Sequence, residues 1–450
     1  MTDRLNLTTG TIARQLFRLS SPIMFGMLMF TLYLLTDLYF VGRLGPDAVA
    51  ALSISGNVFF VHLGLSFIIG TGAMALIAQA YGAKKFSRAK EVFKQSLILS
   101  LIAGSVAAVT GLLIAHPYIS FFGGKGMALK WGVEYFQIYS ISLLFLLLMH
   151  VFSACYRGMG DTKTSMLIIL QSLVLNIILD PVLIFGLAGF PALGVKGAAL
   201  ASLISQIYGV VIYIYLVFVK KQHIHLKGPW TLNLGVIKQS LAIGLPSGVA
   251  YFLMTANLLI TYRVVSPYGT QALASLGIGF RIVQAIYLPS VAICDAMAAM
   301  VGQNFGAKKQ SRVISTFWTG WRISSMLMIA GTVLCWMFPT FLIHLFSQDP
   351  QVTYYGVIYL KIISLANMAV GTILTVSAVF QGIGKTYPTL VCALADNFLF
   401  AIAVFTLPIY FSWGISSVWW IKLMTAVLEM AFCSAWLKYH IKKMSPLSTV

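Results

Sequence analysis

Long apolar stretches dominate this chain, and short polar segments separate them. An α-helix needs about 20 mostly apolar residues to cross a bilayer core, which is about 30 Å thick. Twelve stretches of about this length lie near residues 16–40, 52–80, 92–115, 131–155, 164–187, 195–219, 240–263, 272–300, 316–339, 354–380, 387–411 and 414–437. A membrane β-barrel would show short alternating strands instead. The pattern therefore predicts an all-α integral membrane protein with twelve transmembrane helices.

The pattern of the first half returns in the second half. Residues 20–90 match residues 244–314 without a gap, so that Pro22 recurs as Pro246, an offset of 224 positions. The matched motifs include Gln79-x-x-Gly82-Ala83-Lys84-Lys85 with Gln303-x-x-Gly306-Ala307-Lys308-Lys309, and Ser153-Ala154-x-x-x-Gly158-x-Gly160 with Ser377-Ala378-x-x-x-Gly382-x-Gly384. Solenoid repeats are only about 20–50 residues long. This longer period indicates a duplicated domain.

Each copy holds six predicted helices, and an even number returns the chain to the side from which it started. The two copies should therefore have the same orientation and be related by an axis along the membrane normal. We expect two parallel-repeat six-helix bundles: an N-terminal lobe at 1–220, a cytoplasmic linker at 221–239 and a C-terminal lobe at 240–450. Two bundles that enclose a central cavity are typical of transporters.

Composition and charge agree with a membrane location. Hydrophobic residues make up 59% of the chain, charged residues make up 9%, and the net charge is +19. Most of the 30 Lys and Arg residues lie at the termini or in loops after even-numbered helices. This distribution predicts cytoplasmic termini in an inner (plasma) membrane. Basic loops beside anionic membrane lipids account for the charge, so no nucleic acid partner is expected.

The sequence argues against a nucleotide-driven motor. It contains no Gly-x-x-x-x-Gly-Lys-Ser/Thr phosphate loop, and no soluble segment is long enough to form an ATPase domain. Transport, if this is the function, would draw on an ion gradient. An intramembrane enzyme is a remote alternative. The predicted helices of this chain hold only two histidines, His62 and His150, and these are too few and too isolated along the sequence to form a metal site. His150 is expected instead to line a cavity of the N-terminal lobe.

Five of the eleven acidic residues lie inside predicted helices: Asp37, Asp180, Asp295, Asp396 and Glu429. An ionised carboxylate at the centre of a lipid-facing helix costs about 2.5–3.5 kcal/mol, so each of these should face a cavity or a partner. Asp295 and Asp396 are second-tier candidates for a functional site. Glu429 has a candidate partner in Lys422, seven residues earlier on the same helix face. A structural role is the alternative for all five.

The strongest candidate site combines two helices of the first lobe. Tyr33 precedes Asp37 by four residues and Asn176 precedes Asp180 by four, so each pair shares one helix face. Ser202 on the sixth helix can add a hydroxyl. Close carboxyl groups in a dry cavity can bind a proton, and the same oxygens suit Na⁺. The sequence leaves the choice between H⁺ and Na⁺ open, and no other metal or cofactor is expected.

Pro22 and Gly26 form a candidate hinge in the first helix. Proline removes a backbone donor and glycine weakens a helix, so a bend is expected between them. The alternative interpretation is that Pro22 marks the start of the first helix, near the cytoplasmic side, and that Pro246 starts the seventh helix in the same way.

The combined motifs resemble the multidrug and toxic compound extrusion (MATE) antiporters over residues 10–440. The resemblance rests on the paired lobes, on both copies of Gln-x-x-Gly-Ala-Lys, on Arg157-Gly158-x-Gly160-Asp161-Thr162 and on Asp180-Pro181. The chain is most similar to the DNA-damage-inducible-F (DinF) branch, whose ion-linked residues match Tyr33, Asp37, Asn176 and Asp180. The resemblance also implies that Tyr135 belongs to the same cavity. The NorM branch carries a glutamate in the seventh helix and an aspartate in the tenth. In this chain position 254 is methionine and the tenth predicted helix has no acid, so this C-terminal pair is missing. Met254 is assigned to the substrate cavity.

The resemblance implies a cation-coupled multidrug efflux antiporter that exports amphipathic, often cationic drugs or toxins by alternating access. One chain would enclose a complete pathway, so a monomer is expected. A lipid-linked saccharide flippase of the same superfamily is the alternative, for which deep basic residues would be needed. Arg281 is the one deep arginine that the sequence predicts.

Overall fold

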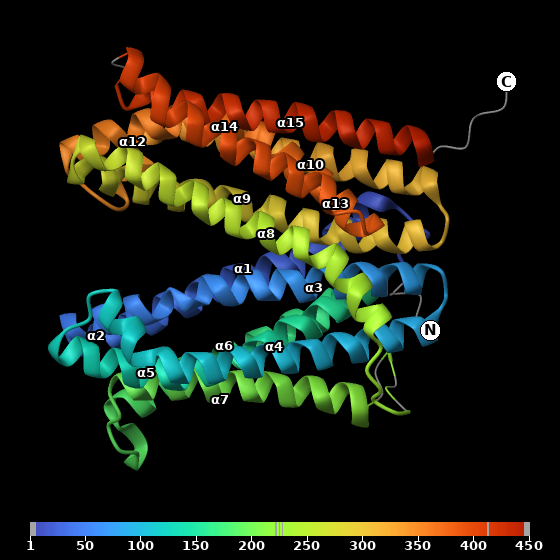
Figure 1. The fold of residues 1–450 in the computed structure, drawn as a ribbon, viewed down its shortest axis with the longest axis horizontal. Helices are drawn as coiled ribbons and strands as arrows, with labels where there is room; N and C mark the ends of the chain where they lie inside the picture. The colour runs from blue at the N-terminus through green and yellow to red at the C-terminus, as the bar shows by residue number, and fades with distance from the viewer. Residues whose placement is uncertain (1–5, 221–222, 225, 227, 412–413, 445–450) are drawn as a thin grey trace. The chain divides into compact units, whose positions relative to one another are not determined.

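The computed structural model describes residues 6–220, 223–224, 226, 228–411 and 414–444 (Figure 1). Every secondary-structure element of these residues is a helix. Residues 221, 222, 225 and 227 of the expected linker lie outside this range, as do the expected cytoplasmic ends at 1–5 and 445–450. Eleven spans of the described chain are long and apolar enough to cross a membrane. The prediction of an all-α, multi-pass membrane protein is confirmed.

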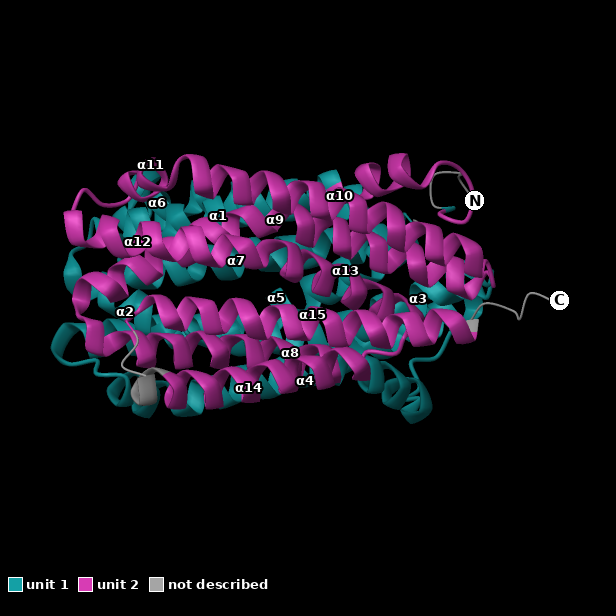
Figure 2. Ribbon diagram, turned by 90° about the horizontal axis from the view of Figure 1, so that it is seen from above, with its two compact units in different colours: residues 1–6, 21–245 teal, residues 7–20, 246–450 magenta. Residues whose placement is uncertain are grey.

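The chain divides by its contacts into two units (Figure 2). Among the described residues, unit 1 comprises residue 6 and residues 21–245, and unit 2 comprises residues 7–20 with the chain from 246 onward. The helices mainly in unit 1 are α1 (Ile12–Gly42), α2 (Pro46–Gly56), α3 (Val58–Gly82), α4 (Phe86–Phe121), α5 (Gly126–Met159), α6 (Thr162–Phe185), the short η2 (Leu187–Gly189), α7 (Val195–Ile214) and the π-turn η3 (Tyr215–Val219).

Unit 2 repeats this plan. Its helices are α8 (Leu234–Val265), whose first turns count with unit 1, η4 (Ser266–Tyr268), α9 (Thr270–Gly306), α10 (Gln310–Met337), α11 (Pro339–His344), α12 (Pro350–Ile363), η5 (Ser364–Ala366), α13 (Asn367–Ile383), α14 (Tyr387–Phe411) and α15 (Ser416–Met444). The helix expected at 316–339 is α10, which is not one of the eleven apolar spans. Arg312 and Arg322 interrupt its apolar character.

Two expected helices consist of shorter pieces. The one expected at 52–80 is formed by α2 and α3, which make one span from Pro46 to Gly82. The one expected at 354–380 is formed by α12, η5 and α13. The start of α8 at Leu234 falls within the range expected for the linker.

The two repeated prolines lie inside helices. α1 begins at Ile12, well before Pro22, and α8 begins at Leu234, well before Pro246. The interpretation of these prolines as helix starts is therefore wrong. Each lacks the N–H that would bond to the preceding turn. The boundary between the units falls beside both prolines, after Ser20 and after Leu245.

Repeated sequence gives repeated backbone geometry. Lys84 and Lys308 both adopt left-handed conformations, with φ of 57° and 59°. In the first copy the Lys85 amide donates to the Ala80 carbonyl at 2.8 Å, and in the second the Lys309 amide donates to Asn304 at 2.9 Å. These contacts end α3 and α9 in the same way, which agrees with a duplicated domain.

The described residues between η3 and α8 pack against the helices of unit 1. Ile224 and Leu226 are buried in its core. Asp161, the N-cap of α6, accepts a hydrogen bond from the Thr164 amide at 3.0 Å and lies 2.6 Å from His223 Nε2. Lys94 donates to the Gly228 carbonyl at 3.1 Å. Burial alone would raise the pKa of Asp161, but the hydrogen bonds from His223 and Thr164 outweigh it, so this pKa is lowered.

Candidate functional site

The two predicted aspartates of unit 1 are buried. Asp37 on α1 is 6% exposed and Asp180 on α6 is 0% exposed. They interact electrostatically with each other. One oxygen of each, Asp37 Oδ1 and Asp180 Oδ2, has no hydrogen-bond partner among the residues described. The structure thus brings together two carboxyl groups that lie 143 positions apart in the sequence, and one oxygen of each is buried without a hydrogen-bond partner among the residues described.

Neighbouring polar groups complete this set. Tyr33 Oη and Ser202 Oγ share a hydrogen bond of 2.6 Å, which joins α1 to α7. Asn176 Nδ2 donates to Asp180 Oδ1 at 3.5 Å, as the four-residue spacing predicted, while Asn176 Oδ1 is unpartnered within the described chain. Tyr33 interacts electrostatically with both aspartates. All five residues predicted for cation binding therefore lie in one region of unit 1.

Two tyrosines of α5 form the other side of this region. Tyr135 and Tyr139 are buried and stacked, with ring centroids 5.4 Å apart. Both interact electrostatically with Asp37. Tyr135 was predicted from the family resemblance alone. Tyr139 was missed, although it follows Tyr135 by one helical turn and a helix-face argument would have found it.

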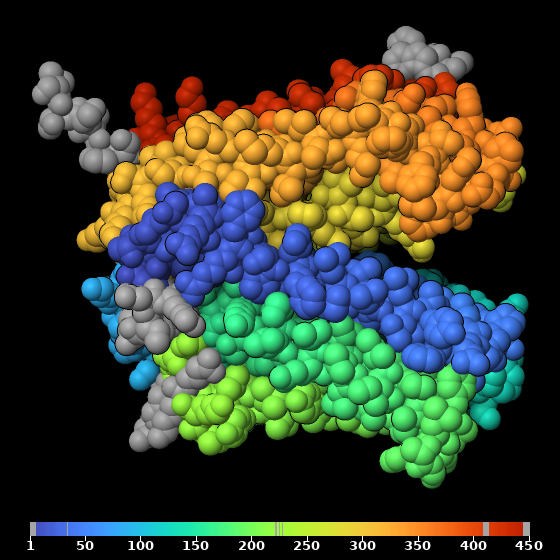
Figure 3. Space-filling model, turned by 180° about the vertical axis from the view of Figure 1, so that it is seen from behind, coloured from blue at the N-terminus to red at the C-terminus, as the bar shows by residue number. Residues whose placement is uncertain are grey.

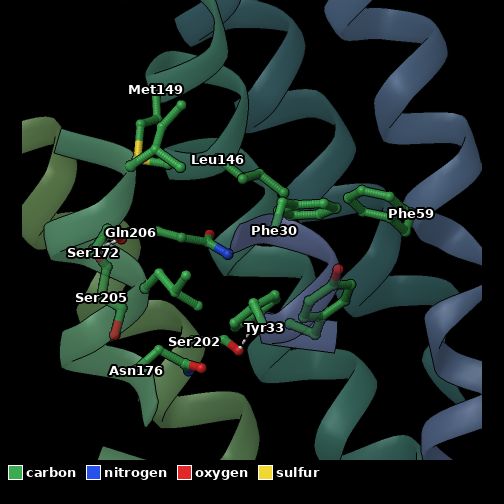
Figure 4. A pocket seen from close by; sticks show the side chains of 13 residues that line it. Phe30, Tyr33, Phe59, Leu146, Met149, Ser172, Asn176, Ser202, Ser205 and Gln206 are labelled. Carbon is green, nitrogen blue, oxygen red and sulfur yellow. Dashed lines mark hydrogen bonds between the residues drawn. The ribbon is translucent and has the colours of Figure 1, made fainter. Parts of the chain in front are cut away.

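A cavity adjoins these residues, and its empty space, which is partly open to solvent, amounts to about 500 Å³ (Figure 4). Its wall combines aromatic and aliphatic side chains with amides and hydroxyls. The lining residues are Phe30, Tyr33, Phe59, Tyr139, Leu146, Met149, Ile169, Ser172, Leu173, Asn176, Ser202, Ser205 and Gln206. Tyr33, Asn176 and Ser202 belong to this wall. A ligand in the cavity would therefore contact Asn176, which donates to Asp180, and Tyr33, which interacts electrostatically with both aspartates.

Gln206 and Ser205 were not predicted, and they extend the polar part of the wall along α7. Gln206 follows Ser202 by four residues, so it lies one turn further on the same face. Its Oε1 atom is buried and has no hydrogen-bond partner among the residues that the structure describes. This oxygen is available to a donor on a bound molecule.

The structure places His150 beside the other intramembrane histidine. His150 Nδ1 lies 3.2 Å from His62 Nε2, which also contacts Ser66 Oγ at 3.1 Å. His150 is not one of the side chains that line the cavity. The two histidines are separated along the sequence but paired in space. The described residues contain no cluster of three or more His, Cys, Asp or Glu side chains that would hold a metal ion.

The other predicted residues lie elsewhere. Met254 is on α8 in unit 2, and 58% of its side chain is exposed. Asp295 on α9 and Asp396 on α14 also belong to unit 2. Pro22 and Gly26 lie on α1, and a Cβ atom at Gly26 would meet no atom within 4 Å. Much of α1 is at the surface (Figure 3).

Comparison with known proteins decides the family. The model of the MatE family matches twice, over residues 22–182 and 246–407. The chain belongs to the MatE family. It is thus a transporter and not an enzyme, and the resemblance to MATE proteins is confirmed, although its DinF branch stays a prediction.

Relatives of this MatE chain match over nearly its whole length. The probable multidrug resistance protein NorM of Thermotoga maritima is 27% identical over 91% of this chain and 88% of the relative. The multidrug export protein MepA of Staphylococcus haemolyticus is 27% identical over 96% and 94%. A crystal structure described as MATE in the bent conformation gives a TM-score of 0.92 at 25% identity, covering 99% of this chain and 98% of the other. A MOP superfamily transporter from Pyrococcus furiosus gives 0.91 at 25% identity, covering 99% of each chain.

Proposed function

We propose that this MatE protein is a cation-coupled exporter of amphipathic, often cationic compounds, coupled to H⁺ or Na⁺. It would lie in the plasma membrane with both termini cytoplasmic and act as a monomer surrounded by lipid. Relatives described as multidrug resistance and multidrug export proteins support the substrate class. The observation that carries the proposal is the pair of buried carboxyl groups beside the cavity.

The charge of this pair requires a counter-ion. If both Asp37 and Asp180 were ionised in the bilayer, the two charges would cost about 5–7 kcal/mol in total, at about 2.5–3.5 kcal/mol each. The ion pairs found among the described residues involve other acids, so neither aspartate has a fixed Lys, Arg or His partner there. A proton or Na⁺ that enters the site offsets this cost. Tyr33, Asn176 and Ser202 would supply further oxygens.

Coupling to the substrate follows from the shared helix. α1 carries Asp37 and Tyr33, and it also carries Phe30, which lines the cavity. When the carboxyl groups bind a cation, the preferred packing of α1 changes, and the cavity wall changes with it. Pro22 and Gly26 supply the weak point at which α1 bends. Alternating access would then be movement of residues 1–220 against residues 240–450.

The cavity wall fits amphipathic compounds. Phe30 and Phe59 stack at 5.6 Å between centroids and present aromatic surface to the cavity. Aromatic faces attract organic cations by about 0.5–2 kcal/mol each. Met149 adds a flexible side chain that adapts to ligands of different shape. Ser172 and Gln206 offer hydrogen bonds without fixing one geometry.

The test is ethidium efflux from vesicles that contain the purified protein, driven by a pH gradient alone or by a sodium gradient alone. Asp37→Asn and Asp180→Asn should each lower the driven rate at least about tenfold, because the amide cannot exchange a proton or hold an ionic charge. Asp47→Asn is the matched control, since Asp47 is exposed at the start of α2. The proposal fails if neither gradient moves ethidium in the wild type, and the saccharide flippase then becomes the better hypothesis.

A further inference from the structure

Two long helices belong partly to each unit. α1 is continuous from Ile12 to Gly42, yet its residues up to 20 count with unit 2 and the rest count with unit 1. α8 is continuous from Leu234 to Val265, and here the part up to 245 counts with unit 1 and the rest with unit 2. The two boundaries lie within one position of each other in the repeat of 224 residues. The starts of the two helices are therefore exchanged between the units.

Arg312 of unit 2 holds the chain that leads into α1. Arg312 lies at the start of α10, and its guanidinium donates to the Gly10 carbonyl at 2.8 Å and to the Thr9 carbonyl at 3.0 Å. It also donates to Gln15 Oε1 at 2.8 Å. The side-chain amide of Gln15 in turn donates to the Thr9 carbonyl at 2.6 Å. The planar fork of arginine can bond several acceptors at once, so Arg312 and Gln15 together close the turn before α1.

The end of α9 holds the residues that precede this turn. The Leu7 amide donates to Gln303 Oε1 at 3.1 Å, and Asn304 Nδ2 donates to the Leu7 carbonyl at 3.2 Å. Lys309 Nζ donates to the Thr8 carbonyl at 2.8 Å. Gln303 and Lys309 belong to the second copy of the Gln-x-x-Gly-Ala-Lys-Lys motif. This motif therefore binds the chain before α1, in addition to ending α9.

The first copy of the repeat makes the equivalent contact with the start of α8. Arg88 and Gln239 occupy the positions of Arg312 and Gln15 in the repeat. Arg88 donates to Gln239 Oε1 at 2.6 Å, and it also lies 3.1 Å from a carboxylate oxygen of Glu91. Because both partners recur at the offset of the repeat, the arginine–glutamine pair is part of the duplicated plan. In each unit it holds the helix start that the unit has received.

The two helix starts differ in what else holds them. A Cβ atom at Gly244 would overlap the Ile68 carbonyl oxygen, so the backbones of α8 and α3 are in direct contact. Small residues allow helices to approach this closely. α1 has Ser20 at the position of Gly244, and a side chain there excludes the same close approach. The start of α1 therefore depends more on its arginine than the start of α8 does.

α1 connects this anchor to the carboxyl region. Its start is held in unit 2 by Arg312, and it carries Tyr33 and Asp37 in unit 1. Gln15 and Asp37 are 22 positions apart, or about 33 Å along a helix. A continuous helix that is held in both units must bend or shift when the units move, and Pro22 weakens it just after the boundary. Without the anchor, the start of α1 could follow unit 1, and the movement would not reach Asp37.

We propose that Arg312 is a positioning residue of this transporter. With Gln15 it anchors the start of α1 to unit 2, so that movement of unit 2 is transmitted along α1 to Asp37. Arg88 and Gln239 are the corresponding pair for α8, with a smaller share of the anchoring. The transmission rests on the proposed function. The anchoring does not.

Hydrogen–deuterium exchange of the purified protein in lipid tests the anchoring. In Arg312→Gln the amides of Leu7 and Gln15, which both donate hydrogen bonds, should exchange at least about tenfold faster, because the charge-assisted bonds of the guanidinium are lost. Arg312→Lys should show most of this effect, since its ammonium keeps the charge but lacks the fork. Arg88→Gln is the matched control and should leave these amides unchanged. Exchange in Arg312→Gln within about threefold of wild type would overturn the proposal.

A double-mutant cycle tests whether Arg312 and Gln15 act together. Gln15→Leu should speed exchange at Leu7 in the wild-type background and add little in Arg312→Gln, because the pair is already broken there. Gln239→Leu, the equivalent change in α8, should not alter exchange at Leu7 in either background. If Gln15→Leu has the same effect in both backgrounds, the two residues act separately and the proposal is wrong. Thermal unfolding in detergent identifies any variant that is not folded.

Spin labels on the two units test the transmission. Lys125→Cys in unit 1 and Gln348→Cys in unit 2 provide the attachment sites, because both positions are exposed and the five native cysteines are buried. In the wild type the distance between the labels should change when the pH is lowered or Na⁺ is added. In Arg312→Gln this change should be lost although Asp37 and Asp180 are intact, whereas Arg88→Gln should retain it.

The label experiment separates this inference from the proposed function. If the wild type responds and Arg312→Gln responds equally, α1 does not transmit the movement, and the inference is wrong while cation coupling stands. If the wild type responds to neither cation, cation coupling and the transmission fail together. The exchange experiment then decides the anchoring by itself.

Discussion

Asp161 links the segment after α7 to the start of α6, and replacing it should release that segment. In Asp161→Ala the Thr164 amide loses its N-cap acceptor at 3.0 Å, which costs about 0.5–2 kcal/mol. The contact of 2.6 Å with His223 is lost as well. A hydrogen bond to a charged group contributes about 1.5–3 kcal/mol, and both side chains of this pair are largely buried. The total is about 2–5 kcal/mol of local stability.

Hydrogen–deuterium exchange measures this loss directly. At about 1.4 kcal/mol per tenfold change, backbone amides near Thr164 and His223 should exchange roughly 30 to 4,000 times faster in the variant. Asp161→Asn keeps a good N-cap and should show the smaller part of the effect. Lys385→Ala is the matched control, because Lys385 occupies the equivalent turn of unit 2.

The pH dependence has a definite sign. The folded-state pKa of Asp161 is lowered, so its stabilisation is complete above the unfolded value of about 3.9 and is lost as the pH falls through the folded value. The difference between wild type and Asp161→Asn should therefore shrink below about pH 4. Exchange in Asp161→Ala that differs from wild type by less than threefold would refute the reasoning.

Two further results are expected. Gly158→Ala should lower the stability of the purified protein by about 1–3 kcal/mol, because the new Cβ atom would lie 2.7 Å from the Met74 carbonyl oxygen. Gly26→Ala should instead raise stability by about 0.5–1 kcal/mol, because a Cβ atom there meets no other atom within 4 Å. The same Gly26 variant should slow ethidium efflux if α1 bends at this position. Ser202→Ala should cost about 0.5–1.5 kcal/mol in the same melting assay through loss of the Tyr33 hydrogen bond, whereas Ser202→Thr should retain it. Equal melting temperatures for either pair of variants would contradict the packing described here.

Several features followed from local sequence alone. Long apolar runs predicted the membrane helices, because backbone groups in lipid must be satisfied within a helix. The repeat predicted two similar halves, and the matching turns at Lys84 and Lys308 show that local sequence sets backbone geometry. Helical spacing predicted that Asn176 would face Asp180. Each of these depends on composition, on helical period or on a comparison of local sequence segments.

Contacts between helices could not be read in this way. Periodicity identifies the face on which a residue lies but not the residue on the neighbouring helix that it meets. The pairing of Lys422 with Asp396, in place of Glu429, is one example, and the contact between His62 and His150 is another. The sequence by itself determined the membrane class, the duplication and the candidate acids, because these depend on composition and helical period. Only the tertiary structure decided which acids lie near one another and which acid pairs with Lys422, because such partners come from different helices.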